Sequence, residues 1–386
     1  MIRGVRTIAV LGSTGSVGTQ TLEVARHLGL QVQGLAAGTN ADLLVAQAAE
    51  FRPRLVSCSQ EVAASVRPHL PAGTRLVTGP EGAHEVAVLQ VDTVVAAITG
   101  MAGLSSTAAA LTAGRHVALA NKESMVVAGP LMRELAQGTG ARITPVDSEH
   151  SALFQCLLGE PRDAVAALVL TASGGPFRTG PADLGDVTLE QALAHPNWAM
   201  GPKVTVDSAT LFNKGLEVLE AHFLFEFPLH DIEVVVHPQS LVHGMVRFRD
   251  GSIKAQVGPH DMRLPIMYAL DAGRPDSGLG PLPLRGEWTF EEPDHARFPS
   301  LGLAYLAGEM GGLAPTYLNA ADEVAVEAFI ARRLPFTAIA EVLRAVLEAA
   351  KPGELTWESV MAADERARML ATEAVDRLAR VNARSA

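Results

Sequence analysis

The sequence of 386 residues predicts an α/β fold in three parts: a doubly wound parallel sheet, an α+β region and a helical bundle. Three observations carry this prediction. Short apolar strands alternate with helical patterns over residues 1–150. Two strand-like runs joined by Asp250 and Gly251 then indicate an antiparallel hairpin. From residue 301 onward the apolar residues recur only with helical spacing.

The chain is too long for a single hydrophobic core, so it should divide into domains. We expect a first domain over residues 1–150 and a second over 151–270. Residues 271–300 combine prolines, glycines and charges without periodicity, which predicts a linker. The last part, 301–386, should be a helical domain.

Composition excludes several classes of protein. A net charge of −11 argues against a nucleic-acid-binding protein. The most apolar region, residues 91–114, is interrupted by Thr, Ser and Gly, so we expect no membrane span. The N-terminus lacks the apolar stretch of a signal peptide. Two cysteines give no disulfide framework and fit a reducing compartment such as the cytoplasm.

A glycine turn follows the first predicted strand. Residues 7–11 are apolar and β-branched, residues 12–18 read G-x-x-G-x-x-G, and a helical pattern follows over 19–27. Such glycines allow the backbone to approach a pyrophosphate, which the helix N-terminus then faces. The turn therefore favours a Rossmann-like nucleotide site over a plain reversal of the chain.

The second predicted strand, residues 31–36, should end near the ribose of a bound dinucleotide. NAD enzymes place an acidic residue there, whereas this chain continues with Ala37, Gly38, Thr39 and Asn40. The missing carboxylate favours NADP, although a basic residue for its 2′-phosphate is missing as well.

Acidic residues follow a later strand. In an extended chain Asp147 and Glu149 would point to one side, where two carboxylates need a cation or a shared proton. Oxygen ligands suit Mg²⁺ or Mn²⁺, with Glu217 as a third carboxylate. The alternative is a solvated strand end.

Lys122 follows the predicted strand at 116–120. It lies either in the ligand crevice or in a surface turn.

Residues 195–217 contain the densest group of chemically useful side chains. Two prolines and a glycine make 195–202 a loop, which we expect to close over a ligand. We expect 204–206 to be extended, Asp207 or Ser208 to cap a helix, and the helix to run over 209–222. Helical spacing then places Asn213, Lys214 and Glu217 on one face near an anion-binding N-terminus.

Lysine is rare in this chain, with only 5 among 31 basic residues. Lys122, Lys203 and Lys214 lie within or beside these motifs, which suggests tasks that need a compact ammonium group. Ser173, in a glycine-rich turn after the strand at 165–171, is a further candidate for anion binding, or simply ends that strand.

Five motifs, at residues 12–18, 121–123, 147–149, 173–177 and 195–217, together resemble the 1-deoxy-D-xylulose 5-phosphate reductoisomerase family. The resemblance implies a V-shaped subunit with an NADPH domain, a catalytic domain and a helical domain, assembled as a homodimer. The implied reaction rearranges the carbon skeleton of the sugar phosphate and reduces it with NADPH to 2-C-methyl-D-erythritol 4-phosphate, in the non-mevalonate isoprenoid pathway.

The resemblance also implies roles for individual residues. The metal, Mn²⁺, Mg²⁺ or Co²⁺, is assigned to Asp147, Glu149 and Glu217. The catalytic residues implied are Lys122, Glu149 and His195. The substrate is assigned to Lys122, Ser148, Ser173, His195, Trp198, Met200, Ser208, Asn213, Lys214 and Glu217. NADPH is assigned to Gly12, Thr14, Gly15, Ser16, Val17, Gly38, Thr39, Asn40, Asn121, Glu123 and Gly201.

Two questions stay open at this point. The route is either a retro-aldol and aldol sequence or a direct α-ketol migration, and the proton is moved by Glu149, Lys122 or an ordered water. The chain also departs from the family pattern twice. Thr39 stands where many members carry Lys or Arg, and Pro202 occupies a place that is often basic, which predicts a stiffer loop and a weaker cofactor contact.

Three other functions compete with this reading. A phosphorylating semialdehyde dehydrogenase shares such a glycine turn but needs a nucleophilic cysteine, and Cys156 lies among apolar residues. A metal-dependent aldolase or isomerase would lack the redox step. A non-catalytic NADP sensor would have no use for three carboxylates and Lys214.

Overall fold

The computed structural model describes residues 4–181, 183–198, 200–271, 274–283 and 285–385. The chain forms two compact units. Unit 1 comprises Met1–Ser124, Met132–Ser151 and Asp261–Pro283, and unit 2 comprises Met125–Leu131, Ala152–His260 and Leu284–Ala386. The domain boundaries expected at 150, 270 and 300 remain a prediction.

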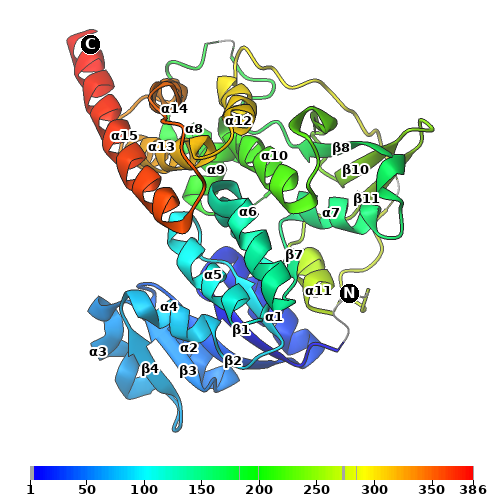
Figure 1. Ribbon diagram of the computed structural model, residues 1–386, viewed down its shortest axis with the longest axis vertical. Coiled ribbons are helices and arrows are strands. Elements are labelled where there is room, and N and C mark those ends of the chain that lie inside the picture. Colours follow the sequence, from blue (N-terminus) through cyan, green and yellow to red (C-terminus); the bar gives the residue numbers. More distant parts are fainter. Residues whose placement is uncertain (1–3, 182, 199, 272–273, 284, 386) are drawn as a thin grey trace. The chain divides into compact units, whose positions relative to one another are not determined.

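Unit 1 is built on a seven-stranded parallel sheet, whose order is β4-β3-β2-β1-β5-β6-β7. The order reverses between β1 and β5, and ligands bind beyond the carboxyl ends of strands at such a reversal. This sheet confirms the predicted Rossmann-like fold. Its strands are β1 (Thr7–Leu11), β2 (Gln31–Ala36), β3 (Leu55–Cys58), β4 (Arg75–Thr78), β5 (Thr93–Ala96), β6 (His116–Leu119) and β7 (Ile143–Pro145), coloured from blue to green in Figure 1.

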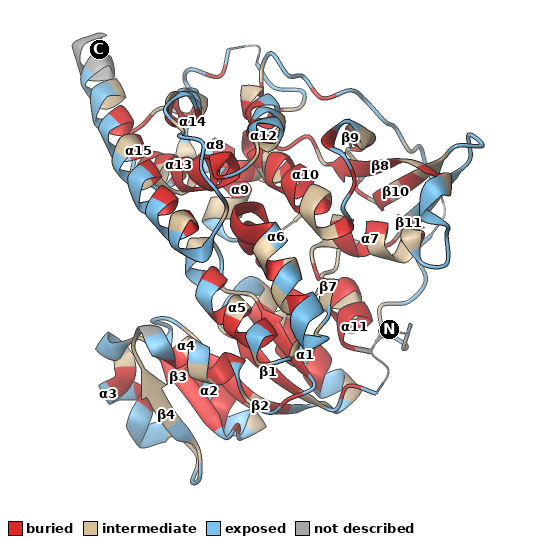
Figure 2. Ribbon diagram, in the orientation of Figure 1, coloured by how far each residue is buried: buried red, intermediate tan, exposed pale blue. Residues whose placement is uncertain are grey.

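Helices follow the strands of unit 1, and the core between them is apolar. The central strands are buried in Figure 2, with Ile8, Val10, Leu35 and Val56 at their centre. The helices are α1 (Ser16–Leu28), α2 (Ala41–Phe51), α3 (Ala63–Val66), α4 (Pro80–Ala87), α5 (Leu104–Thr112) and α11 (Arg263–Asp271). Helix α6 (Lys122–Thr139) belongs partly to each unit and departs from helical geometry at Ala128, close to Pro130, which removes a helical hydrogen bond.

The glycines of the first turn are required by close packing. Gly12 has φ of +81°, and a Cβ atom there would lie 2.5 Å from the Ala97 carbonyl oxygen. At Gly18 a Cβ atom would lie 2.1 Å from the Gly12 carbonyl oxygen. Helix α1 has no acidic residue in its first turn, which leaves its positive end available to an anion.

Unit 2 contains a four-stranded sheet of order β11-β10-β8-β9. Strands β8 (Val165–Ala172) and β9 (Ile232–Val236) are parallel, while β10 (Val242–Phe248) is antiparallel to β8 and to β11 (Ile253–Val257). The β10–β11 hairpin confirms the antiparallel pairing expected around Gly251. The helices α8 (Leu189–Ala192), α9 (Pro202–Ala209) and α10 (Phe212–Phe225) belong to this unit, and α7 (Ser148–Leu157) belongs partly to each unit.

The C-terminal part is helical, as its spacing predicts. It consists of α12 (Pro299–Met310), α13 (Ala314–Ile330), α14 (Ala338–Glu348) and α15 (Trp357–Ser385), the last drawn in red in Figure 1. Figure 2 shows α15 with buried and exposed residues alternating along its length, as expected for a helix that packs one face on its neighbours. The segment 271–300, which we expected to be a linker, is attached to unit 2 at one point. There Glu291 forms an antiparallel β-bridge with Val236 at the end of β9.

Three local expectations in the 195–217 stretch are wrong. Residues 204–206 are not extended but belong to α9, because Thr205, Val206 and Ala209 form a buried helical face that outweighs their β propensity. Pro202 is the first residue of this helix rather than part of the loop, a place where its fixed φ is favourable. The next helix begins at Phe212 rather than residue 209, and its N-cap is Leu211, with φ of +57°, rather than Asp207 or Ser208, which lie within α9.

Among the described residues, no helix combines the length and the apolar character needed to cross a membrane.

The contact of α10 with α12 provides a test of the packing. A Cβ atom at Gly215 would lie 2.6 Å from the Cβ atom of Ala304, so we expect Gly215→Ala to lower the free energy of unfolding by about 1–3 kcal/mol. Gly302, exposed on α12 with no atom within 4 Å of its Cβ position, is the matched control. Gly302→Ala should stabilise by about 0.5–1 kcal/mol in the same denaturant titration. If both variants changed the free energy of unfolding by the same amount, the close contact of Gly215 with Ala304 would be contradicted.

Candidate active site

The residues expected to bind the cofactor follow the carboxyl ends of strands in unit 1, apart from Gly201 in unit 2. Residues 12–17 follow β1, residues 38–40 follow β2, and Asn121 and Glu123 follow β6. Asn40 caps α2, since its Oδ1 atom accepts a hydrogen bond of 3.2 Å from the Leu43 N–H. Thr39 is exposed in the same turn, where a 2′-phosphate contact would be expected.

Asn121 joins two of these loops. Its Oδ1 atom accepts the Ser124 N–H at 3.1 Å, which caps α6. Its Nδ2 atom donates to the Gly100 carbonyl at 3.0 Å and to Glu123 Oε2 at 2.9 Å. The side chain thus fixes the loop after β5 to the start of α6, a structural role that the sequence did not indicate.

Lys122 and Asp147 form a partly buried ion pair in unit 1. The Lys122 Nζ atom lies 2.6 Å from Asp147 Oδ2, and the two side chains are 10% and 16% exposed. Burial alone would raise the pKa of Asp147, but the Lys122 ammonium and then His150 hold it well below its usual range. Asp147 is therefore ionised, and Lys122 faces the acidic motif rather than a surface turn.

The extended geometry assumed for Asp147 and Glu149 is wrong. Helix α7 begins at Ser148, so Glu149 lies in its first turn and Asp147 directly precedes it. The Ser148 N–H donates to Asp147 Oδ1 at 3.0 Å, and the Ser148 hydroxyl donates to the Glu149 carboxylate. Both contacts join neighbouring residues at the start of α7, where the chain leaves the extended conformation of β7.

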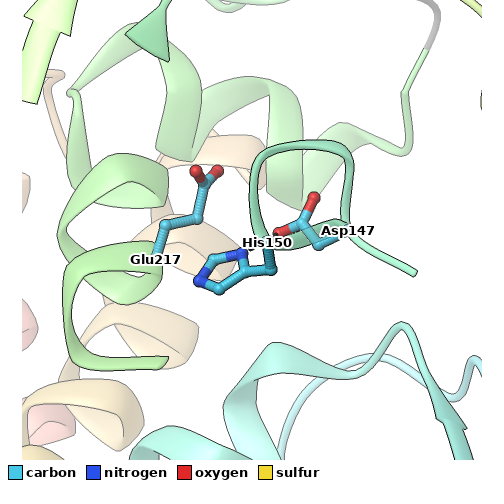
Figure 3. Close-up of side chains that lie close together, drawn as sticks. All are labelled: Asp147, His150 and Glu217. Carbon is cyan, nitrogen blue, oxygen red and sulfur yellow. Dashed lines mark ion pairs between the residues drawn. The ribbon is translucent and has the colours of Figure 1, made fainter. Parts of the chain in front are cut away.

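His150 was in the acidic motif but received no role from the sequence. Its side chain is fully buried, and Nδ1 lies 3.7 Å from Asp147 Oδ2. Figure 3 shows Asp147 and His150 at the start of α7 and Glu217 on α10, and each carries an oxygen or nitrogen atom of a kind that ligates metals. The predicted metal ligands belong to both units, Asp147 and Glu149 to unit 1 and Glu217 to unit 2.

Within unit 2, Ser173 and His195 lie together. The Gly175 N–H donates to Ser173 Oγ at 3.2 Å, and His195 Nε2 is 3.1 Å from the same oxygen. His195 Nδ1 accepts the N–H groups of Asn197 at 3.2 Å and Trp198 at 3.0 Å. A neutral ring therefore carries its proton on Nε2 and donates it to Ser173, which leaves the serine hydroxyl proton for another acceptor.

The loop containing Ser173 also touches the end of α9. Gly175 has φ of +65°, and a Cβ atom there would lie 2.8 Å from the Ser208 carbonyl oxygen. Only glycine allows this approach without strain. Ser173 and Ser208, both expected to bind the substrate phosphate, thus lie on segments that are in direct contact.

Asn213, Lys214 and Glu217 share a face of α10, as their spacing predicts. Asn213 Nδ2 donates to Glu217 Oε1 at 2.7 Å, and the Lys214 ammonium donates to Glu217 Oε2. Lys214 and Glu217 are buried, 4% and 0% exposed. A buried ion pair of this kind costs desolvation energy, which is tolerated where the charges serve a function or are fully paired.

The loop at 195–200 is attached to the rest of unit 2 by contacts that the sequence did not reveal. Asn197 Nδ2 donates to the Pro238 carbonyl at 2.8 Å and to Ser240 Oγ at 2.9 Å. The Trp198 ring lies 5.5 Å from that of His260 and 6.1 Å from that of His243. Met200 is half-buried in the same loop, and residue 199 lies outside the described residues.

Cys156 does not resemble a catalytic thiol. It is 2% exposed on α7, within the apolar interior, which argues against the semialdehyde dehydrogenase alternative.

Comparisons with known proteins agree with these observations. Residues 8–129 match the family 1-deoxy-D-xylulose 5-phosphate reductoisomerase, residues 143–225 its C-terminal domain, and residues 257–370 the DXP reductoisomerase C-terminal domain. The 1-deoxy-D-xylulose 5-phosphate reductoisomerase of Thermus thermophilus is 57% identical over 364 residues, which are 94% of this chain and 98% of that protein.

Solved structures of similar proteins cover nearly the whole chain. The reductoisomerase of Zymomonas mobilis in complex with NADPH is 40% identical with a TM-score of 0.89, over 96% of this chain and 99% of that chain. A DOX-P reductoisomerase in complex with NADPH, fosmidomycin and magnesium is 39% identical with a TM-score of 0.91, over 96% and 98%. The chain therefore belongs to the 1-deoxy-D-xylulose 5-phosphate reductoisomerase family.

Proposed function

We propose that this chain converts 1-deoxy-D-xylulose 5-phosphate into 2-C-methyl-D-erythritol 4-phosphate, using NADPH and a divalent metal. The observation that carries the proposal is the group of anion-binding side chains in unit 2. Ser173, Ser208 on the segment against Gly175, and Asn213 and Lys214 on one face of α10 supply the hydroxyl, amide and ammonium donors that suit a phosphate.

The carboxylates fit a hard divalent cation. Asp147 and Glu217 are each paired with a lysine ammonium, so positive charge already stabilises both of them in ionised form. We assign Asp147, Glu149 and Glu217 as oxygen ligands of Mg²⁺, Mn²⁺ or Co²⁺. When bound, the metal supplies Lewis-acid polarisation of the substrate oxygens.

The remaining steps are carried by side chains of this chain. Lys214, Asn213, Ser208 and Ser173 bind the phosphate end, and His195 fixes the orientation of Ser173. Trp198 and Met200 cover the sugar and exclude water from the reduction. Lys122 places its ammonium group against Asp147, the residue directly before Ser148.

We assign the nucleotide to unit 1. Residues 12–17, 38–40, 121 and 123 lie beyond the carboxyl ends of β1, β2 and β6, where dinucleotides bind in sheets of this type. Gly201, the remaining residue predicted to bind the cofactor, directly precedes α9 in unit 2.

We also propose a homodimer that works in the cytoplasm. Strand β11 is an edge strand with Ile253 55% exposed, and edge strands are suited to pairing with a second copy. Both cysteines are free, which fits a reducing compartment. Sedimentation of the purified chain tests the dimer.

The reaction itself is tested by following NADPH absorbance with 1-deoxy-D-xylulose 5-phosphate and Mn²⁺. We expect oxidation that requires both the sugar phosphate and the metal and that stops when a chelator is added. Glu217→Gln, which removes a ligand charge, should lower kcat at least about 100-fold. Cys156→Ala is the control and should keep full activity. Oxidation without the sugar phosphate would reject the proposal.

Thr39 tests the choice of cofactor. An arginine at this exposed position can pair with a 2′-phosphate, so we expect Thr39→Arg to raise the NADPH to NADH ratio of kcat/KM roughly tenfold. Thr39→Glu is the matched control and should lower the ratio by repulsion. An unchanged ratio in both variants would place the 2′-phosphate elsewhere.

Asn197 tests the closing loop. Asn197→Ala removes two hydrogen bonds that attach the loop to residues 238–240, so the loop should be held less firmly in the position described. We expect the KM for the sugar phosphate to rise about five- to tenfold with little change in Tm. Asp183→Ala, which removes only a turn contact to Gly185 upstream, should leave KM unchanged. Identical KM values for both variants would show that this attachment does not control closure.

A further inference from the structure

A buried three-residue ionic cluster lies between α9 and α13 in unit 2. Lys203 Nζ is 2.7 Å from Asp207 Oδ2 and 2.6 Å from Asp322 Oδ2. The two carboxylate side chains are 1% and 0% exposed, while that of Lys203 is 25% exposed. Lys203 is one of the few lysines of this chain, and none of the roles above accounts for it.

Charge is not balanced in this cluster if both carboxylates are ionised. Burial, and then the negative charge of Asp207, raise the pKa of Asp322 well above its usual range. A protonated Asp322 would leave one ion pair, between Lys203 and Asp207, with the Asp322 carboxyl group beside the same ammonium group. No buried charge would then be unpaired.

Stability alone does not explain such a cluster. Apolar residues of similar volume often replace a buried ionic group without loss of stability, or with a gain. What an ionic cluster adds is a single defined geometry between the elements it joins, because the two oxygens fix the position of one ammonium group.

The position of the cluster suggests what that geometry serves. Lys203 is the second residue of α9, directly after the closing loop, and Asp322 lies in the middle of α13. At the other end of the short helix α9, the Ser208 carbonyl packs against Gly175. A shift or rotation of α9 would therefore move Ser208 relative to Ser173.

We propose that Lys203 and Asp322 are positioning residues, which hold α9 on the C-terminal helices so that Ser208 stands at the phosphate site. This inference rests on the proposed function, since it takes Ser208 as a phosphate ligand. It gives the C-terminal helices a part in substrate affinity, although they contribute no residue to the assigned site.

The test compares substitutions that keep or remove the contact. Asp322→Leu removes the acceptor but leaves the Lys203–Asp207 pair, so no buried charge becomes unpaired and the variant should fold. We expect the Kd for inorganic phosphate and the KM for the sugar phosphate to rise roughly tenfold, with a smaller change in kcat. Asp322→Asn keeps an oxygen acceptor and should restore near-normal values of both constants.

The neighbouring residue provides the control. Glu323 pairs with Arg368 on α15, so Glu323→Gln should lower Tm and leave the Kd for phosphate unchanged. Ser208→Ala is the reference, because it removes the assigned ligand itself and should raise that Kd directly. Calorimetry with inorganic phosphate gives all the affinities without requiring turnover.

The outcomes separate this inference from the proposed function. If Ser208→Ala raises the Kd while Asp322→Leu lowers only Tm, the cluster is merely structural and the inference is overturned. If Ser208→Ala leaves the Kd unchanged, the phosphate site itself is wrongly assigned. If Asp322→Asn raises the Kd for phosphate as much as Asp322→Leu does, the charge of Asp322 matters rather than its position as an acceptor. That result would also overturn the inference. Should Asp322→Leu not fold, the smaller Asp322→Ala takes its place.

Discussion

Buried carboxylates paired with scarce lysines are the constraint on which this structure depends. Lys122 pairs with Asp147, Lys203 with Asp207 and Asp322, and Lys214 with Glu217. A carboxylate can be buried and ionised only when a cation or several donors accompany it. Three of the five lysines of this chain supply those ammonium groups, although most of its basic residues are arginines.

Several features could be predicted because their physical cause is local. Gly12 and Gly18 follow from close contacts within one turn, and the shared face of Asn213, Lys214 and Glu217 follows from helical spacing alone. Residues at the carboxyl ends of β1, β2 and β6 could be placed because a parallel sheet gathers those ends at one edge.

Other features depend on contacts between distant segments and left no local trace. The β-branched residues 204–206 suggested a strand, yet the buried face of α9 and the contact of Lys203 with Asp322 favour a helix. Asn197 meets Ser240, and Trp198 meets His260, across separations that no spacing rule covers. Glu149 was assigned to an extended chain because the sequence does not show that a helix begins directly after Asp147.

An acidic chain can bind an anionic substrate because affinity depends on local rather than total charge. The net charge of −11 lies largely on exposed side chains, whose field is screened by salt. At the assigned phosphate site the ammonium group of Lys214 is buried in a medium of lower dielectric constant, where it pairs with Glu217 and lies on a helix face that also carries the amide of Asn213. His195 adds a further donor, since its Nδ1 atom accepts two backbone N–H groups and Nε2 faces Ser173. The site therefore combines one fixed charge with oriented dipoles, an arrangement that selects a phosphate without making the surrounding surface basic.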